Sequence, residues 1–322
     1  MDLITTAAAR ARGIDKDELT RLVDTGEIHR LALGAYYAGD HPHALAVRAQ
    51  IIAAVSGPTA IICRRTAAWL WGLDVLPPGK TSHDWPVELL VAAGERTRPR
   101  RPGCRGHEAE ITSADITLLG GVAITTQERT ALDCARFLPR LEAVAALDQF
   151  LRRRVEIESL QTRALALAGR RNAKRLREVL QLGDAGAQAP SESWTRVLIV
   201  DAGLPRPETQ IHVILPSGAE VFVDMGYPNQ LVGVEYDGEK YHSSAEDLAH
   251  DAWRRAQLRE CGWELVIVRK SDVLGRPADY LEDLTGKLLS RGWRPSTEQM
   301  TFVLTRLRML RNREARFRLY AA

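Results

Sequence analysis

The stretch VFVDMGYPNQLVGVEYDGEKYH, residues 221–242, decides the predicted fold of this chain, because it has the pattern of two β-strands joined by a turn. The PNQ segment at 228–230 has turn chemistry that brings the two strands side by side as a hairpin. Successive side chains of a strand point to opposite faces, so Glu235 and Asp237 share one face of the second strand. We therefore expect a hairpin with carboxylates gathered on one face.

The first strand of this hairpin supplies a third acid. Strand alternation predicts that Asp224 points away from Val221, Val223 and Met225. Three clustered carboxylates repel one another unless a cation lies between them, and oxygen ligands of this kind suit Mg²⁺ or Mn²⁺. We therefore predict that Asp224 forms a metal site with the two acids of the second strand. The alternative is that each acid is solvated or paired with an arginine.

Composition and cysteine spacing limit the class of protein. The 322 residues are 45% hydrophobic and 26% charged, which is ordinary for a globular protein of two or three domains. The cysteines form no CxxC pair, so the sequence indicates neither a zinc site nor a disulfide framework. The first residues lack a basic segment, and no apolar run approaches the roughly 18 residues of a membrane span. We expect a cytoplasmic protein without a membrane partner.

Positive charge is concentrated in three arginine-rich segments, although the formal net charge is only +3. These segments lie at 96–105, at 152–177 and in the tail at 306–318. Arginine suits bidentate contacts with phosphate, so the clusters favour a polyanionic partner. The alternative is a genome whose composition favours arginine codons everywhere. The tail residues expected to bind such a partner are Arg306, Arg308, Arg311 and Arg313.

Residues 1–40 have the pattern of a small winged helix-turn-helix. A first helix is predicted at 4–13, and Asp15 caps a second helix at 16–26. A hairpin that turns at Gly34 follows. The second helix carries more acidic than basic residues, which makes it a poor surface for phosphates. Protein docking and base reading are therefore both open as roles of this module.

Residues 45–182 form the predicted middle domain, an α+β unit made mostly of helices. A strand is predicted at 86–94, and a second strand leads into a helix within 120–138. No catalytic group stands out in this region. A linker of small residues and proline at 183–193 marks the next domain boundary.

The predicted third domain spans 187–292 and alternates helices with strands. A helix beginning at Ser191 is followed by three strands, a long helix from Ser244 and a strand that begins at Glu264. The resulting order is α-β-β-β-α-β. Residues 293–322 are expected to form a basic C-terminal helix.

Parts of the first 182 residues resemble the AbiEi-type antitoxins of bacterial abortive-infection toxin–antitoxin systems. The stretch RGIDKDELTRLVDTGEIHRLALGAYYAG at 12–39 resembles the N-terminal winged-helix domain of that family. A T-T-x-x-R-T-x-x-D segment at 125–133 also resembles the family; in it we expect Thr126 to cap a helix and Arg129 to pair with Asp133. The resemblance implies a cognate toxin or a second copy of the chain as a partner.

The segment 187–292 resembles the very-short-patch-repair-like branch of the PD-(D/E)XK nucleases, whose restriction-endonuclease-like core has the order α-β-β-β-α-β. The matching motifs are E-S-x-x-R at 192–196, A-G-L-P at 202–205, V-D-x-x-Y-P at 223–228, V-E-Y-D-G-x-x-Y-H at 234–242 and D-x-x-R at 251–254. The resemblance implies hydrolysis of phosphodiester bonds in DNA.

The same resemblance implies a role for each motif residue. Asp224 and Glu235 would be the metal-binding acids, and Glu192 would complete the acidic shell. His242 would act as a general base or as an acid toward the leaving group. Gln210 would orient the attacking water or a phosphate oxygen.

The sequence departs from the general motif at one position, because Asp237 stands where the family has a lysine. The lysine's role would then fall to Asp237 with a second metal ion, to Lys240 or to His242. Arg254 would brace the site together with Asp251 or hold the DNA backbone.

The sequence therefore predicts a multidomain α+β and α/β protein that acts as a Mg²⁺- or Mn²⁺-dependent DNA endonuclease. Phage defence, toxin–antitoxin biology and DNA repair are the settings that the two resemblances imply. The alternative is a DNA-binding transcriptional regulator or antitoxin whose nuclease fold is catalytically silent.

Overall fold

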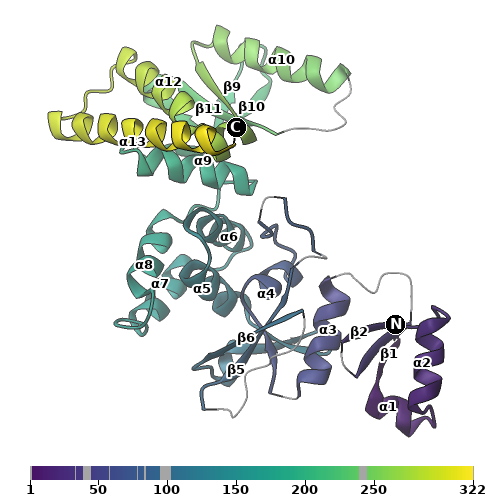
Figure 1. Cartoon of the computed structure of the whole chain (residues 1–322). Coiled ribbons are helices and arrows are strands. Elements are labelled where there is room, and N and C mark those ends of the chain that lie inside the picture. The colour runs from purple at the N-terminus through teal and green to yellow at the C-terminus, as the bar shows by residue number, and fades with distance from the viewer. Residues whose placement is uncertain are drawn as a thin grey trace. The chain divides into compact units, whose positions relative to one another are not determined.

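The computed structural model describes residues 2–32, 34–38, 45–57, 59–77, 79–82, 85–94, 103–238 and 245–321. The chain divides into two compact units, Met1–Gln181 and Leu182–Ala322, and Figure 1 shows the elements of both. No helix in these described ranges is long and apolar enough to cross a bilayer.

The first described residues form a small sheet and a pair of helices. The elements are β1 (Asp2–Thr5), α1 (Thr6–Ala11), α2 (Lys16–Asp24), β2 (His29–Ala32) and β3 (Ala35–Ala38), and the strand order is β1-β3-β2. Asp15 caps α2 as predicted, accepting the N–H of Glu18 at 2.9 Å. Gly34 takes a left-handed φ of 81° between β2 and β3, which confirms the predicted hairpin. The helix predicted from residue 4 is wrong at its start, because Ile4 pairs with Tyr36 in the sheet.

A five-stranded mixed sheet organises residues 45–125. Its elements are α3 (Leu45–Ser56), β4 (Ile61–Ile62), α4 (Arg64–Leu70), β5 (Val87–Ala92), β6 (Cys104–Ala109), η1 (Ser113–Asp115), β7 (Ile116–Leu119) and β8 (Val122–Thr125), in the strand order β6-β5-β4-β8-β7. Ile62, Leu89 and Ile124 are fully buried in one cluster. The sequence predicts β5 and β8 but not the other strands. β4 has only two residues and β6 is largely polar, so neither shows the periodicity of a strand.

The helices α5 (Gln127–Phe137), α6 (Arg140–Arg152), α7 (Ile157–Leu165) and α8 (Ala173–Leu182) complete this region. Thr126 caps α5 by accepting the N–H of Arg129 at 3.3 Å, as predicted. The predicted pair is also confirmed, since Nε of Arg129 donates to Oδ2 of Asp133 at 3.1 Å. Arg129 further binds Asp115 at 3.0 Å, which ties α5 to the 3₁₀ turn η1.

The second unit is built on a four-stranded sheet with the strand order β12-β11-β10-β9. Its elements are α9 (Pro190–Asp201), β9 (Glu208–Ile214), β10 (Glu220–Tyr227), η2 (Pro228–Gln230), β11 (Val232–Asp237), α10 (Ala245–Glu260), β12 (Glu264–Arg269), α11 (Lys270–Gly275), α12 (Pro277–Ser290) and α13 (Thr297–Ala321). β10 and β11 pair antiparallel around η2, which confirms the predicted hairpin, and β12 adds parallel to β11. The order from α9 to β12 is the predicted α-β-β-β-α-β.

Two apolar clusters hold helices against this sheet. The larger one joins β10, β11 and β12 to α9, α11, α12 and α13, and Val234, Leu281 and Val303 are fully buried in it. The smaller one joins Leu258 of α10 to Val221 of β10. Because α13 supplies part of the larger cluster, this basic helix belongs to the core of the second unit.

Candidate active site

Asp224 lies in the middle of β10 and its carboxylate reaches the neighbouring strand. Its Oδ2 accepts the backbone N–H of Tyr236, the residue after Glu235, at 2.8 Å. Burial raises the pKa of the Asp224 carboxyl, and this effect outweighs the Tyr236 hydrogen bond; the nearby Glu235 charge raises the pKa further. The structure therefore brings Asp224 and Glu235 together from adjacent strands, as the sequence predicted.

The side-chain alternation of β10 is interrupted at Asp224. Strict alternation would place Val221, Val223 and Met225 on one face, but Val221 and Val223 pack with α10 whereas Met225 belongs to the larger cluster. The predicted common face of these three residues is therefore wrong. On the neighbouring strand Gln210 has a left-handed φ of 51°, and the β9–β10 ladder passes from Val223 to Met225 without a pair at Asp224. The carboxylate thus stands at a local irregularity of both strands.

Glu235 is almost fully buried and is held by an arginine of α10. Its residue exposure is 1%. Nη1 of Arg254 donates to Oε1 at 2.7 Å and Nη2 donates to Oε2 at 2.9 Å, so the pair is bidentate. Arg254 also donates to the carbonyl of Phe222 at 2.9 Å, which anchors α10 to β10. The alternative of arginine pairing, left open by the sequence, thus applies to Glu235.

Asp237 shares its face with Glu235 but is more exposed. Arg255 lies between the two acids: its Nε is 3.4 Å from Oε2 of Glu235, and its Nη2 is 3.6 Å from Oδ2 of Asp237. Arg269 at the end of β12 is 3.9 Å from the same Asp237 oxygen. Basic side chains from a helix and a strand therefore offset the acidic charge on this face.

The oxygen atoms at this place are of the chemical type that binds a divalent cation, but their arrangement in this structure does not form a metal site. Carboxylate oxygens on adjacent strands are the ligands that Mg²⁺ and Mn²⁺ prefer. Within the described ranges, however, no group of three or more His, Cys, Asp or Glu residues could hold a metal ion. Both oxygens of Glu235 are engaged by Arg254. A cation at Glu235 would therefore compete with this arginine for the same oxygens.

Glu192 of α9 is linked to the sheet through a glutamine. Its Oε2 accepts the backbone N–H of Gln188 at 2.8 Å, and the Gln188 side chain donates to Oε1 of Gln210 at 2.8 Å. Gln210 in turn lies on β9, the strand next to β10. The structure thus connects Glu192 and Gln210 in one hydrogen-bonded chain. His242 and Lys240 lie outside the described residues.

Sequence reasoning missed two side chains of this site. Arg255 contacts both acids of β11. The sequence feature that could have indicated it is the pair of consecutive arginines at the end of the D-x-x-R motif in α10. Gln188 lies within the predicted linker. A linker glutamine has no distinctive sequence signal, because its role depends on the side chain that the fold brings opposite to it.

The tail arginines have unequal surroundings. Nε of Arg306 donates to the carbonyl of Asp201 at 3.0 Å, and Nε of Arg311 donates to Oε1 of Glu282 at 2.7 Å. Both side chains therefore hold α13 to its own unit. Of the four tail arginines predicted to bind DNA, Arg308 and Arg313 are exposed, and a nucleic acid could reach them without breaking these contacts.

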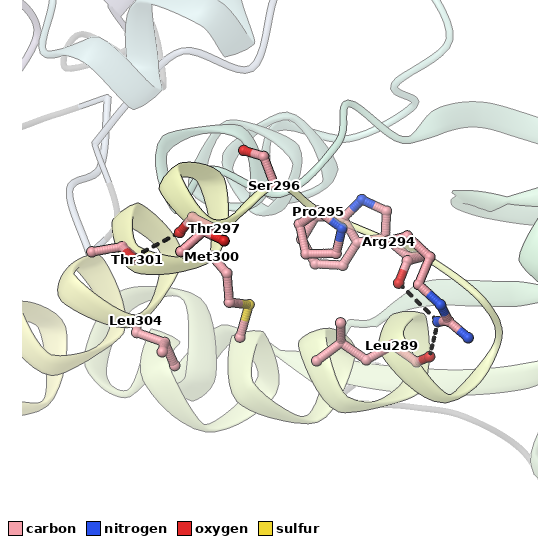
Figure 2. A pocket seen from close by; sticks show the side chains of 9 residues that line it. Leu289, Arg294, Pro295, Ser296, Thr297, Met300, Thr301 and Leu304 are labelled. Carbon is pink, nitrogen blue, oxygen red and sulfur yellow. Dashed lines mark hydrogen bonds between the residues drawn. The ribbon is translucent and has the colours of Figure 1, made fainter.

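An open hollow of about 470 Å³ lies where α12 turns into α13. Figure 2 shows Leu289, Met300 and Leu304 around it, with Arg294 at one end, where its side chain donates to the carbonyl of Leu289 at 3.0 Å. The lining is mainly apolar, and no acid of β10 or β11 belongs to it. The hollow is therefore separate from the carboxylates of the hairpin.

Comparisons with known proteins define the class of both parts of the chain. Residues 60–182 match the AbiEi antitoxin C-terminal domain, and residues 209–288 match the family REase_MTES_1575. The chain thus carries an AbiEi-related domain followed by a restriction-endonuclease-like domain. The AbiEi assignment needs correction in one respect, because the match is to the C-terminal domain and residues 1–40 lie outside it. The very-short-patch-repair-like branch stays a prediction.

Two proteins of Mycobacterium tuberculosis are similar to most of the chain. They are named uncharacterized protein MT2308, from strain CDC 1551 / Oshkosh, and uncharacterized protein Rv2248, from strain ATCC 25618 / H37Rv. Each is 30% identical over 263 residues, which cover 81% of this chain and 93% of the relative. The chain belongs to the family of these mycobacterial proteins.

Proposed function

We propose that this protein is a metal-dependent DNA endonuclease whose active site lies on the β10–β11 hairpin. The observation that carries the proposal is the approach of Asp224 to the backbone of Tyr236, directly beside Glu235, within a restriction-endonuclease-like domain. Glu235 is nearly buried, and the pKa of Asp224 is raised. Carboxylates in such surroundings are more typical of functional sites than of acids that only keep a protein soluble.

The residues of the site have distinct roles in this proposal. Asp224 and Glu235 would hold Mg²⁺ or Mn²⁺, with Asp237 as a further acid beside them. A cation bound there would polarise the scissile phosphate and lower the pKa of the attacking water.

Arg255 would hold phosphate oxygens, since a guanidinium suits their geometry. Glu192 would keep Gln210 in place through Gln188.

Other residues from the motifs complete the proposal. His242 would transfer a proton at the attacking water or at the leaving oxygen, and Lys240 would contact the DNA backbone. Arg308 and Arg313 on α13 would add contacts to phosphates. The AbiEi-related domain favours a setting in phage defence or toxin–antitoxin biology, with a cognate toxin or a second copy as the partner and DNA repair as a further setting.

A second function is favoured by one observation, the bidentate pair of Arg254 with Glu235. If that pair is permanent, Glu235 is a structural counter-ion and the nuclease fold is silent. The protein would then be a DNA-binding regulator or antitoxin, and residues 1–40 would supply a winged helix-turn-helix.

The two functions differ in a direct assay. The full chain would be incubated with supercoiled plasmid in Mg²⁺, in Mn²⁺ and in EDTA, and the ends of any product would be mapped. The nuclease predicts metal-dependent nicked or linear product with 5′-phosphate and 3′-hydroxyl ends. The regulator predicts a shifted but intact plasmid under all three conditions.

A further inference from the structure

The guanidinium of Arg254 occupies the carboxylate of Glu235, which is also a predicted ligand of the metal ion. A carboxylate that accepts one hydrogen bond at each oxygen from a single guanidinium has its best acceptor directions occupied. In this structure those distances are 2.7 and 2.9 Å, and the Glu235 side chain is only 2% exposed. A divalent ion seeking the same oxygens would meet both the steric bulk and the positive charge of Arg254. Arg254 and a metal ion therefore compete for Glu235.

The Arg254 side chain is nevertheless in contact with solvent. Its side chain is 20% exposed, so it lies at the edge of the site rather than beneath it. Its planar donor fork binds phosphate in the same manner as carboxylate. Arg255 stands beside it at 3.4 Å from the same carboxylate, so an arriving phosphate would meet a pair of guanidiniums on one helix.

We propose that Arg254 is an exchangeable counter-ion, which moves from Glu235 to a nucleic-acid phosphate and so opens the carboxylate to a divalent cation. The inference rests on the proposed nuclease function and adds a positioning role to Arg254. Without a polyanion the pair is closed and the site has low affinity for metal. With a polyanion bound, the arginine is drawn away and the carboxylate is released.

The electrostatics of the site make this exchange reciprocal. A phosphate that enters alone is repelled by Asp224, Glu235 and Asp237, and a cation that enters alone is repelled by Arg254 and Arg255. When both enter, each charge has a partner again. The binding of metal and of nucleic acid must therefore be positively coupled, and thermodynamic linkage requires the same factor in both directions.

The test measures Mn²⁺ binding by the full chain, from the electron paramagnetic resonance signal of free Mn²⁺. Titrations are run on the protein alone, on the protein with a phosphorothioate DNA duplex that resists hydrolysis, and on the protein with a methylphosphonate duplex whose backbone is uncharged. The Mn²⁺ that each duplex binds without protein is measured separately and subtracted. Wild type is compared with Arg254→Lys, which keeps the charge but loses the bidentate fork, and with Arg254→Gln. Arg259→Gln, an exposed arginine on the same helix, is the matched control. Thermal melts establish that each variant is folded.

The proposal predicts that the charged duplex raises the Mn²⁺ affinity of wild type and of Arg259→Gln by about tenfold or more, since one charge-assisted pair has to be broken. The methylphosphonate duplex should have no such effect. Without DNA, Arg254→Gln should bind Mn²⁺ about as tightly as wild type does with DNA. Arg254→Lys, which keeps the positive charge but loses the bidentate fork, should bind Mn²⁺ more tightly than wild type does without DNA.

Two results would overturn the exchange. The first is Mn²⁺ affinity of wild type that is unchanged by the charged duplex although both ligands bind. The second is an Arg254→Lys variant with wild-type affinity in the absence of DNA. Plasmid cleavage by wild type together with either result would leave the nuclease function standing without the exchange. Mn²⁺ binding by Arg254→Lys, with no binding by wild type under any condition, would show that Arg254 blocks Glu235 permanently, and it would contradict both the exchange and the nuclease function.

Discussion

Arg254 on α10 and Glu235 on β11 form a bidentate ion pair, with donor–acceptor distances of 2.7 and 2.9 Å around a carboxylate that is almost fully buried. This pair determines how the carboxylates of the hairpin respond to substitution. Asp224 instead accepts a backbone N–H, and burial raises its pKa. Neighbouring acids of the same site therefore differ in what each of them contributes to stability.

The two acids should respond oppositely to isosteric neutralisation. Glu235→Gln leaves the partly buried Arg254 without its counter-ion and should lower the free energy of unfolding by about 3–5 kcal/mol. Asp224→Asn relieves repulsion with Glu235 and keeps an oxygen that can accept the Tyr236 N–H, so its stability in EDTA should equal or exceed that of wild type. Chemical denaturation of both variants measures this. Equal destabilisation by the two changes would contradict the assignment of their partners.

The tail should contribute to stability through its apolar face. Leu307 is 5% exposed and packs in the larger cluster of the second unit, so Leu307→Ala should cost about 2–5 kcal/mol. Leu304 on the same helix is 54% exposed, and Leu304→Ala should change stability by less than about 0.5 kcal/mol. The difference is read from the unfolding transition of the second unit. Similar values for both leucines would show that α13 does not dock as described.

The tail should also bind nucleic acid through its exposed arginines rather than through its docked ones. Replacing Arg308 and Arg313 together by glutamine should lower the slope of log affinity against log salt by about 0.9 for each phosphate that the tail no longer neutralises. Arg306→Gln should leave the slope unchanged, because its guanidinium binds the carbonyl of Asp201. Filter binding over a salt series measures both. A lower slope for Arg306→Gln alone would reverse this assignment.

The first unit should owe part of its acid sensitivity to Asp115. Burial alone would raise the pKa of Asp115, but the N–H of Thr112 and the guanidiniums of Arg129 and Arg163 hold it below the ordinary value. A depressed pKa stabilises the folded state above the unfolded pKa of about 3.9, and this contribution is lost as the pH falls through the folded pKa. Asp115→Asn should therefore be less stable than wild type at neutral pH, and the difference should shrink below about pH 4. A difference that stays constant with pH would contradict the depressed pKa.

The hairpin could be predicted from sequence because its information is local. The turn residues between Pro228 and Gln230 and the alternation in β11 specify the pairing of the strands and the common face of Glu235 and Asp237. The capping residues Asp15 and Thr126 were predictable for the same reason. Strands with little periodicity, such as β4, form only because long-range pairing supplies their hydrogen bonds.

The charge balance of the site could not be predicted in the same way. Arg254 and Glu235 are 19 residues apart and meet only after α10 has docked on the sheet. The break in alternation at Asp224 also depends on another strand, since Gln210 on β9 takes the left-handed conformation. Sequence patterns predict which chemical groups a site contains, whereas the ion pairs that these groups form depend on tertiary contacts.

If the carboxylates of β10 and β11 catalyse phosphodiester hydrolysis, cleavage and binding of the same DNA should distinguish wild type from Asp224→Asn. Asp224→Asn keeps the shape of the side chain and removes its charge. We predict cleavage by wild type in Mg²⁺ or Mn²⁺, cleavage by the Arg259→Gln control at the wild-type rate, and none by Asp224→Asn, which should bind DNA at least as tightly as wild type. Wild-type cleavage by Asp224→Asn, or an intact substrate with wild type in every metal, would contradict catalysis by these carboxylates.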